Sequence, residues 1–179
     1  CNPVVPTEPK RNDLIFLDIH RPENFKYKER MENIIKYANK CGDKYNLPVK
    51  MLKFHGTCKS INDNNLKLEN IELTELMSYK NYLSPIYHCK FIISDSGTAQ
   101  EEPAIFDTPV IVPRDYTERP QSVEANCSYM LNINTDQNFE SSWKWLKQIE
   151  DKKLQMDIGW LGEGNTSDLV INELKKIFS

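Results

Sequence analysis

Residues 94–102, SDSGTAQEE, combine a glycine with the hydroxyl groups that a phosphorylated ligand needs. They follow the apolar run 91–93, so the pattern predicts a strand, a glycine turn and the start of a helix. Gly97 lets the backbone approach a ligand closely. The amides of Gly97 and Thr98 would point out of the helix start, where the dipole favours an anion, and Ser96 adds a hydroxyl donor. The stretch therefore predicts a diphosphate site.

Two acids follow this turn, and they could complete a nucleotide site. A carboxylate such as Glu101 or Glu102 can accept hydrogen bonds from both hydroxyls of a ribose. A structural alternative exists, because Thr98 to Glu101 also forms the pattern of a capping box. The stretch has neither the dinucleotide-binding nor the Walker glycine pattern. Pro103 follows Glu102 and disfavours helical geometry just before it.

Two further stretches place charged groups after predicted strands. DIHRPEN, residues 18–24, carries His20 and Arg21, which could meet an anion. PRDYTERPQSVEA, residues 113–125, carries Arg119, whose guanidinium could hold a phosphate or carboxylate. Each stretch alone is also typical of a solvated loop or a helix start. Because ligands bind beyond the carboxyl ends of parallel strands, the three together favour one binding site.

The elements that position these stretches alternate along the chain. Strands are predicted at 14–19, 49–54, 71–73, 91–94, 109–112 and 129–133. Helices are predicted at 26–40 (stopped by Gly42), 79–87, 99–106, 120–125, 139–149 and 166–177. Most of the strands are apolar throughout, which is typical of a parallel sheet covered by helices on both faces. We therefore expect an α/β fold.

Composition excludes several function classes. The chain has 179 residues, with 26 acids against 23 bases, and no excess of base that would indicate nucleic-acid binding. Its apolar runs are too short for a membrane span. The five cysteines form no CxxC pair, which favours free thiols and a cytoplasmic location. The three histidines lack metal-ligand spacing, so no metal is expected.

The motifs HRPEN, DSGTAQEE and RDYTERPQSVEA, in this order, resemble the UDP-N-acetylglucosamine 2-epimerase family. NPVV near the start and LGEGNTSDLVINEL near the end are also similar to the family pattern, so the resemblance covers nearly the whole chain. It implies a Rossmann-like domain, one half of a glycosyltransferase-B type fold. Residues 13–179 would be the carboxyl-terminal, UDP-binding domain. Residues 1–12 would be a linker from an amino-terminal domain that is missing here.

The resemblance also implies roles for particular residues. Those expected to hold the diphosphate and the ribose are Ser96, Gly97, Thr98 and Glu102. Those expected to act catalytically at the diphosphate, where charge builds as UDP leaves, are His20 and Arg119. The backbone near Tyr82 is expected to meet the uracil. Arg21, Glu23 and His55 are candidates for a regulatory nucleotide site of the kind found in some bacterial members. Thr98 stands where the family usually has a second glycine.

The family reaction removes UDP from UDP-N-acetylglucosamine and adds it back with the configuration at C2 inverted, giving UDP-N-acetylmannosamine; hydrolysing members release N-acetylmannosamine and UDP. No cofactor is implied, and the parent protein is expected to be a homodimer. The acid/base carboxylates for C2 belong to the amino-terminal domain, so the 179-residue chain should be inactive alone. The alternatives are half of a UDP-sugar glycosyltransferase and a non-catalytic UDP-sugar-binding domain.

Overall fold

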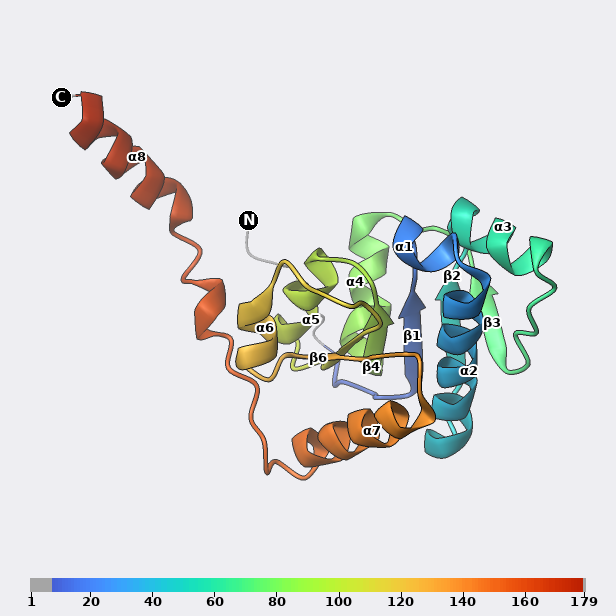
Figure 1. Cartoon of the computed structure of the whole chain (residues 1–179). Coiled ribbons are helices and arrows are strands. Elements are labelled where there is room, and N and C mark those ends of the chain that lie inside the picture. Colours follow the sequence, from blue (N-terminus) through green and yellow to red (C-terminus); the bar gives the residue numbers. More distant parts are fainter. Residues whose placement is uncertain (1–7, 179) are drawn as a thin grey trace.

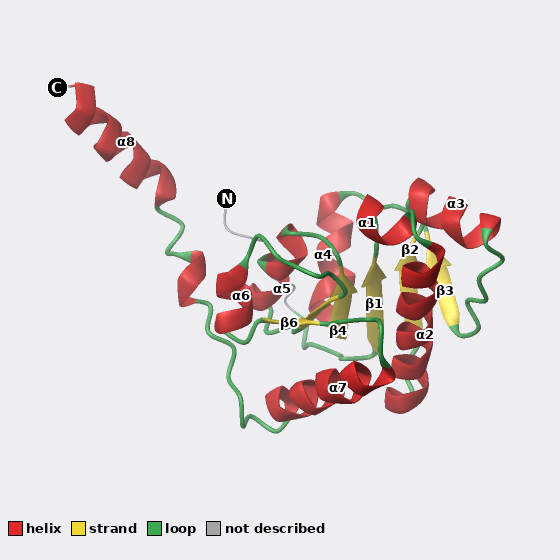
Figure 2. Cartoon of the chain, viewed as in Figure 1, coloured by secondary structure: helices red, strands yellow, loops and turns green. Residues whose placement is uncertain are grey.

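A six-stranded parallel sheet forms the centre of the chain. The computed structural model describes residues 8–178, and the strand order is β3-β2-β1-β4-β5-β6 (Figures 1 and 2). The strands are β1 Leu14–Asp18, β2 Val49–Leu52, β3 Ile71–Thr74, β4 Cys89–Ser94, β5 Val110–Val112 and β6 Ser128–Met130. Every neighbouring pair is parallel. The predicted α/β fold with a parallel sheet is confirmed.

Helices bury both faces of this sheet. Ile15 and Leu17 of β1 belong to one core cluster, with side chains from α2 (Lys28–Tyr45) and α7 (Asp136–Glu150). Leu14 and Phe16 point the other way, into a cluster shared with α4 (Tyr79–His88) and with Ala99 and Phe106, which flank α5 (Glu102–Ile105). Successive side chains of a strand face opposite sides, so a strand covered on both faces must be apolar throughout. All residues of β1 are accordingly buried.

The remaining helices lie at the ends of the strands and at the end of the chain. They are α1 Pro22–Phe25, α3 His55–Asp63, α6 Pro120–Glu124 and α8 Thr166–Phe178, with 3-10 turns at Thr98–Gln100 and Gly159–Leu161. Figure 1 shows α8 projecting away from the sheet and its helices. No residue of α8 is buried.

The prediction that Gly42 stops the second helix is wrong. α2 continues to Tyr45 and ends at Asn46, which adopts the left-handed conformation with φ 52°. A Cβ on Gly42 would lie 3.1 Å from the Cγ2 of Val49. The glycine therefore serves close packing of the helix against the chain that enters β2, rather than termination.

Other elements also differ from the predictions. α3 was not predicted, because the sequence HGTCKSIND has few apolar residues to form a helical stripe. The predicted helix 99–106 is divided at Glu101 into the 3-10 turn and α5. Pro103 lies in the first turn of α5, where a missing amide donor is tolerated. The division agrees with the effect expected of this proline.

The predicted linker, residues 1–12, is only partly described, since residues 1–7 lie outside the described range. Lys10 donates hydrogen bonds to the main-chain oxygen of Asp107 at 2.7 Å and to the hydroxyl of Thr108 at 2.8 Å. Tyr87 donates to the main-chain oxygen of Glu8 at 2.8 Å. The described end of this segment is thus attached to the domain. Within residues 8–178, no helix is both long and apolar enough to cross a membrane.

Candidate functional site

The three motif-bearing loops follow β1, β4 and β5, which are neighbours in the sheet. β1 and β4 are adjacent in space although β2 and β3 separate them in sequence, so the strand order reverses between them. Asp18 at the end of β1 pairs with Ser94 at the end of β4. The loops after them therefore leave the sheet side by side, at the position where open α/β sheets bind ligands.

Asp95 joins the first loop to the second. Its side chain is fully buried and accepts hydrogen bonds from the amides of His20 and Arg21, both at 3.0 Å, and from the Asn24 side chain at 2.9 Å. Burial raises the pKa of Asp95, and these hydrogen bonds oppose that rise. Asp95 thereby fixes the backbone that carries His20 and Arg21.

His20 contacts a second buried acid, Asp18. The His20 Nδ1 lies 2.8 Å from Oδ1 of Asp18, and the hydroxyl of Tyr82 donates to Oδ2 of Asp18 at 2.7 Å. The hydrogen bond with Asp18 raises the pKa of His20, against the opposing effect of burial. Tyr82 also uses its amide inside the chain, donating to Ser78 at 2.9 Å. Both donors of Tyr82 are therefore occupied, and the predicted uracil contact gains no support from them.

The turn at Gly97 does not have the left-handed conformation that requires glycine, since its φ is −66°. A Cβ on Gly97 would meet only Nη2 of Arg21, at 3.8 Å. Packing within the chain therefore tolerates a side chain here, and the space beside Gly97 is open toward a guanidinium. Next to it, the hydroxyls of Ser96 and Thr98 lie 3.0 Å apart. The turn therefore places two hydroxyl groups beside an open space at the end of β4.

The capping-box alternative is wrong. No side chain caps the 3-10 turn or α5, and Thr98 pairs with Ser96 instead. Glu101 forms an ion pair with Arg119 from the third loop. Beside this pair, Thr117 donates to the side chain of Gln100 at 2.6 Å. Glu101, the acid of the alternative capping box, therefore links the second and third loops.

Arg114 joins the first and third loops. It is only 2% exposed, and it donates to Glu23 at 2.6 Å and to Glu118 at 2.7 and 3.0 Å. These hydrogen bonds lower the pKa of Glu118 to about 2. Each pair of loops is therefore linked by at least one charged side chain, and the predicted convergence of the three stretches is present in the structure.

Glu102, the residue expected to hold a ribose, begins α5 and is partly buried. It accepts a hydrogen bond from the Tyr79 hydroxyl at 3.1 Å. Burial raises the pKa of Glu102. The contact with Tyr79 occupies Oε1 only, so the second carboxylate oxygen remains available to a hydroxyl-bearing ligand.

The three candidates for a regulatory site have different surroundings. Glu23 is held by Arg114. Nε of Arg21 is buried and has no hydrogen-bond partner among the described residues. His55 is exposed at the first position of α3, after β2. These positions adjoin the first loop, but only Arg21 has a buried donor left without a partner.

The sequence reasoning missed the residues that hold the loops together. Asp18 falls inside the predicted strand 14–19, and the sequence assigns no role to it, to Asp95 or to Arg114. An acid directly after an apolar strand was the available signal, because a buried carboxylate needs donors from its neighbours. The identity of those donors depends on which strands are adjacent, and the sequence alone does not state it.

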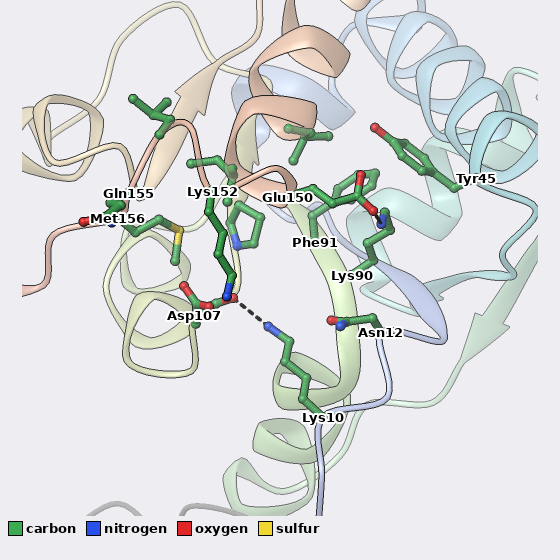
Figure 3. Close-up of a pocket in the computed structure, with 14 residues that line it drawn as sticks. Lys10, Asn12, Tyr45, Lys90, Phe91, Asp107, Glu150, Lys152, Gln155 and Met156 are labelled. Atoms are coloured by element: carbon green, nitrogen blue, oxygen red, sulfur yellow. Dashed lines mark hydrogen bonds and ion pairs between the residues drawn. The ribbon is translucent and has the colours of Figure 1, made fainter.

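A groove of about 450 Å³ lies at the opposite edge of the sheet, near the start of β4 (Figure 3). Lys10 there donates to the main-chain oxygen of Asp107, and Lys90 forms an ion pair with Glu150 at 2.9 Å. Because these two of the three lysines that line the groove already have partners, and Asp107 and Glu150 line it as well, this groove offers an anion less than the carboxyl edge does.

The family model described as UDP-N-acetylglucosamine 2-epimerase matches residues 4–175. The chain belongs to this family. A UDP-N-acetylglucosamine 2-epimerase of Methanococcus maripaludis is 26% identical over 171 residues, covering 91% of this chain and 44% of that protein. One from Methanocaldococcus jannaschii is 32% identical over 130 residues, covering 70% of this chain and 36% of that protein.

The family relationship extends to solved structures. The crystal structure of the M. jannaschii UDP-GlcNAc 2-epimerase in complex with UDP-GlcNAc and UDP superimposes with a TM-score of 0.78 at 27% identity. The match covers 93% of this chain and 46% of that one. The chain thus spans less than half the length of the epimerases it matches, and it corresponds to one of the two halves of their fold.

Proposed function

We propose that this chain is the UDP-binding, carboxyl-terminal domain of a UDP-N-acetylglucosamine 2-epimerase. The observation that carries the proposal is the convergence of three loops, linked by Asp95, Arg114 and Arg119, at the point where the strand order reverses. Family membership supports the choice of ligand, since a related epimerase binds UDP-GlcNAc and UDP. The runner-up functions, a glycosyltransferase half and a non-catalytic binding domain, have no comparable support.

In this proposal the turn at Ser96, Gly97 and Thr98 holds the diphosphate, and Glu102 holds the ribose hydroxyls. The open space beside Gly97 and the two neighbouring hydroxyls support the first assignment. The uncommitted oxygen of Glu102 supports the second. The uracil would lie near Tyr82 and would contact groups other than the hydroxyl and the amide of Tyr82.

His20 and Arg119 would act where negative charge builds on the diphosphate as UDP leaves. His20 is favoured in its charged form by Asp18. Arg119 pairs with Glu101 through Nε and donates to the main-chain oxygen of Glu118 through Nη1, so Nη2 is the nitrogen that would face the ligand. Donors fixed around a developing oxyanion are worth ~3–4 kcal/mol each in comparable sites. Arg21 and His55 would border a second, regulatory nucleotide, with Glu23 orienting the loop through Arg114.

The parent protein would interconvert UDP-GlcNAc and UDP-ManNAc, or release ManNAc and UDP, and it would be a homodimer. Its acid/base groups for C2 would come from an amino-terminal half that this chain lacks. The apolar side chains of α8 fit that arrangement. Val170, Leu174 and Ile177 lie on one side of the helix and are 52%, 47% and 71% exposed. We expect the 179-residue chain alone to bind UDP and to epimerise nothing.

Calorimetric titration with UDP, UDP-GlcNAc and ADP tests the proposal. The chain should bind UDP and UDP-GlcNAc in preference to ADP, and Arg119→Ala should weaken UDP binding about tenfold through loss of one charge-assisted contact. Arg11→Ala is the matched control, because Arg11 is half exposed and pairs with Asp13 away from the three loops. Equal binding of ADP and UDP, or an equal effect of both arginine variants, would contradict the assignment.

A further inference from the structure

His20 is oriented by a buried carboxylate that belongs to the end of the first strand. We propose that Asp18 is a positioning residue for the His20 imidazole. It holds the ring so that Nε2 faces the ligand at the carboxyl edge of the sheet and can donate a proton to a phosphate oxygen. This inference rests on the proposed function, because that function supplies the anion.

The geometry leaves one orientation for the ring. Nδ1 of His20 lies 2.8 Å from Asp18, which is 3% exposed, whereas the His20 side chain is 32% exposed. An ionised carboxylate only accepts hydrogen bonds, so Nδ1 must be the donor. Nε2 lies across the ring and has no hydrogen bond to any residue within 8–178. The nitrogen that remains for a ligand is therefore Nε2.

Tyr82 fixes the carboxylate in turn. Its hydroxyl donates to the second oxygen of Asp18 at 2.7 Å, so both oxygens of the buried acid have a donor. The Tyr82 ring packs against that of Phe16, with centroids 5.7 Å apart. The imidazole is thus held by a carboxylate that cannot rotate without losing a hydrogen bond.

The charged and titratable groups that face His20 favour its cation. These groups are Asp18 and Arg21 from its own strand and loop, Asp95 directly after β4, and Tyr82 from α4, which contacts Asp18. The ring of Phe54, after β2, packs on the imidazole and carries no charge. Two of the groups are carboxylates and one is a guanidinium. The hydrogen bond with Asp18 is the largest influence, and it raises the pKa of His20 more than burial lowers it. The raised pKa widens the pH range over which the ring is a cation, the form in which Nε2 carries an N–H.

The test measures the pKa of each histidine by NMR in the 179-residue chain, whose three histidines His20, His55 and His88 can be assigned by substitution. The variant is Asp18→Asn, which keeps the shape and removes the charge. Tyr82→Phe is the matched control, because it removes one hydrogen bond from the same carboxylate and leaves its charge. UDP and inorganic pyrophosphate serve as anions in parallel titrations.

We expect Asp18→Asn to lower the pKa of His20 and to weaken pyrophosphate and UDP binding about tenfold, as for the loss of one charge-assisted hydrogen bond. Tyr82→Phe should leave the pKa of His20 above its ordinary value. An unchanged pKa in Asp18→Asn overturns the proposal, and so does a lowered pKa with unchanged affinity.

Two further outcomes are decided by the same measurements. If the unmutated chain binds neither anion, the proposed function fails, and with it the role of Asp18 toward a ligand; the pKa values would then report only a structural pair. If Asp18→Asn does not fold, the imidazole nitrogen shifts of the unmutated chain decide. Neutral His20 must carry its proton on Nδ1, and a proton on Nε2 with Nδ1 bare overturns the proposal.

Discussion

The carboxyl edge of the sheet and helix α8 differ in how many of their side chains are buried and have partners within the chain. At the carboxyl edge, Asp95 and Arg114 are buried, and each has several partners on neighbouring loops. On α8, Leu174 and Ile177 are 47% and 71% exposed, and no residue of the helix is buried. The loops of the first region are held together by buried contacts within the chain, whereas no residue of α8 is buried in it.

The difference separates what this domain does alone from what it needs a partner to do. A site whose loops are fixed by buried polar contacts is preorganised, so it can bind a ligand without first paying for loop ordering. An exposed apolar helix face requires another surface to bury it. The comparison therefore predicts binding without turnover in the isolated chain, and the following substitutions test its two sides.

The largest effect should follow from removing the acid that joins the first two loops. Asp95→Ala leaves the amides of His20 and Arg21 and the side chain of Asn24 without their buried acceptor. We expect a loss of about 3 kcal/mol in the free energy of unfolding, measured by urea denaturation. Asp115→Ala is the control, because Asp115 is an exposed partner of Arg30 and should contribute less than ~1 kcal/mol. Equal losses would mean that the carboxyl edge is no more preorganised than the surface.

A side chain at the open turn should weaken binding and leave stability unchanged. In Gly97→Ala the new Cβ meets only Arg21, at 3.8 Å, and the φ of −66° suits alanine. We expect an unchanged free energy of unfolding and UDP binding weaker by about tenfold, because the methyl group lies where a phosphate would approach. Calorimetry and urea denaturation of the same sample give both quantities. If the variant is destabilised, the glycine is required by the fold and not by ligand binding.

Anion binding should weaken as pH rises through the pKa of His20. That pKa is raised in the folded chain by Asp18, so the stability that the pair contributes is complete below the ordinary value of 6.5 and is lost as the pH rises through the raised pKa. The affinity for UDP should fall over the same range, since only the cation offers both N–H groups. His20→Gln should abolish this dependence between pH 6 and 9 in calorimetric titrations. A pH profile that is unaltered in His20→Gln would assign the dependence to another group.

The sequence predicted the strands and loops that form the site better than the side-chain contacts between those loops. Strand positions follow from apolar runs, and the meeting of three loops follows from the rule that parallel strands share a carboxyl edge. The individual contacts do not follow, because Glu101 was equally suited to cap a helix or to bind Arg119. Only the adjacency of β4 and β5 decides between these partners.

Local pattern also failed where tertiary contacts determine the structure. Glycine commonly ends a helix, yet Gly42 lies inside α2, where it is in close contact with Val49. α3 lacks an apolar stripe, and its position is fixed by two contacts. The buried Thr57 donates to the main-chain oxygen of Ile19. Gly56 packs so closely on Phe25 that a Cβ added to it would collide with the ring. Both cases depend on contacts between different elements, which periodicity does not detect.

The smallest effect should occur on α8. Leu174→Gln keeps the helix propensity nearly constant, and Leu174 is exposed, so the free energy of unfolding of the 179-residue chain should change by less than ~0.5 kcal/mol. The same substitution at Leu146, which is 5% exposed on α7, should cost ~3 kcal/mol. In a protein that also carries the amino-terminal half, Leu174→Gln should become destabilising, because its surface would then be buried. A loss above ~1 kcal/mol in this chain alone would mean that α8 packs on its own domain, and the contrast between the two regions would disappear.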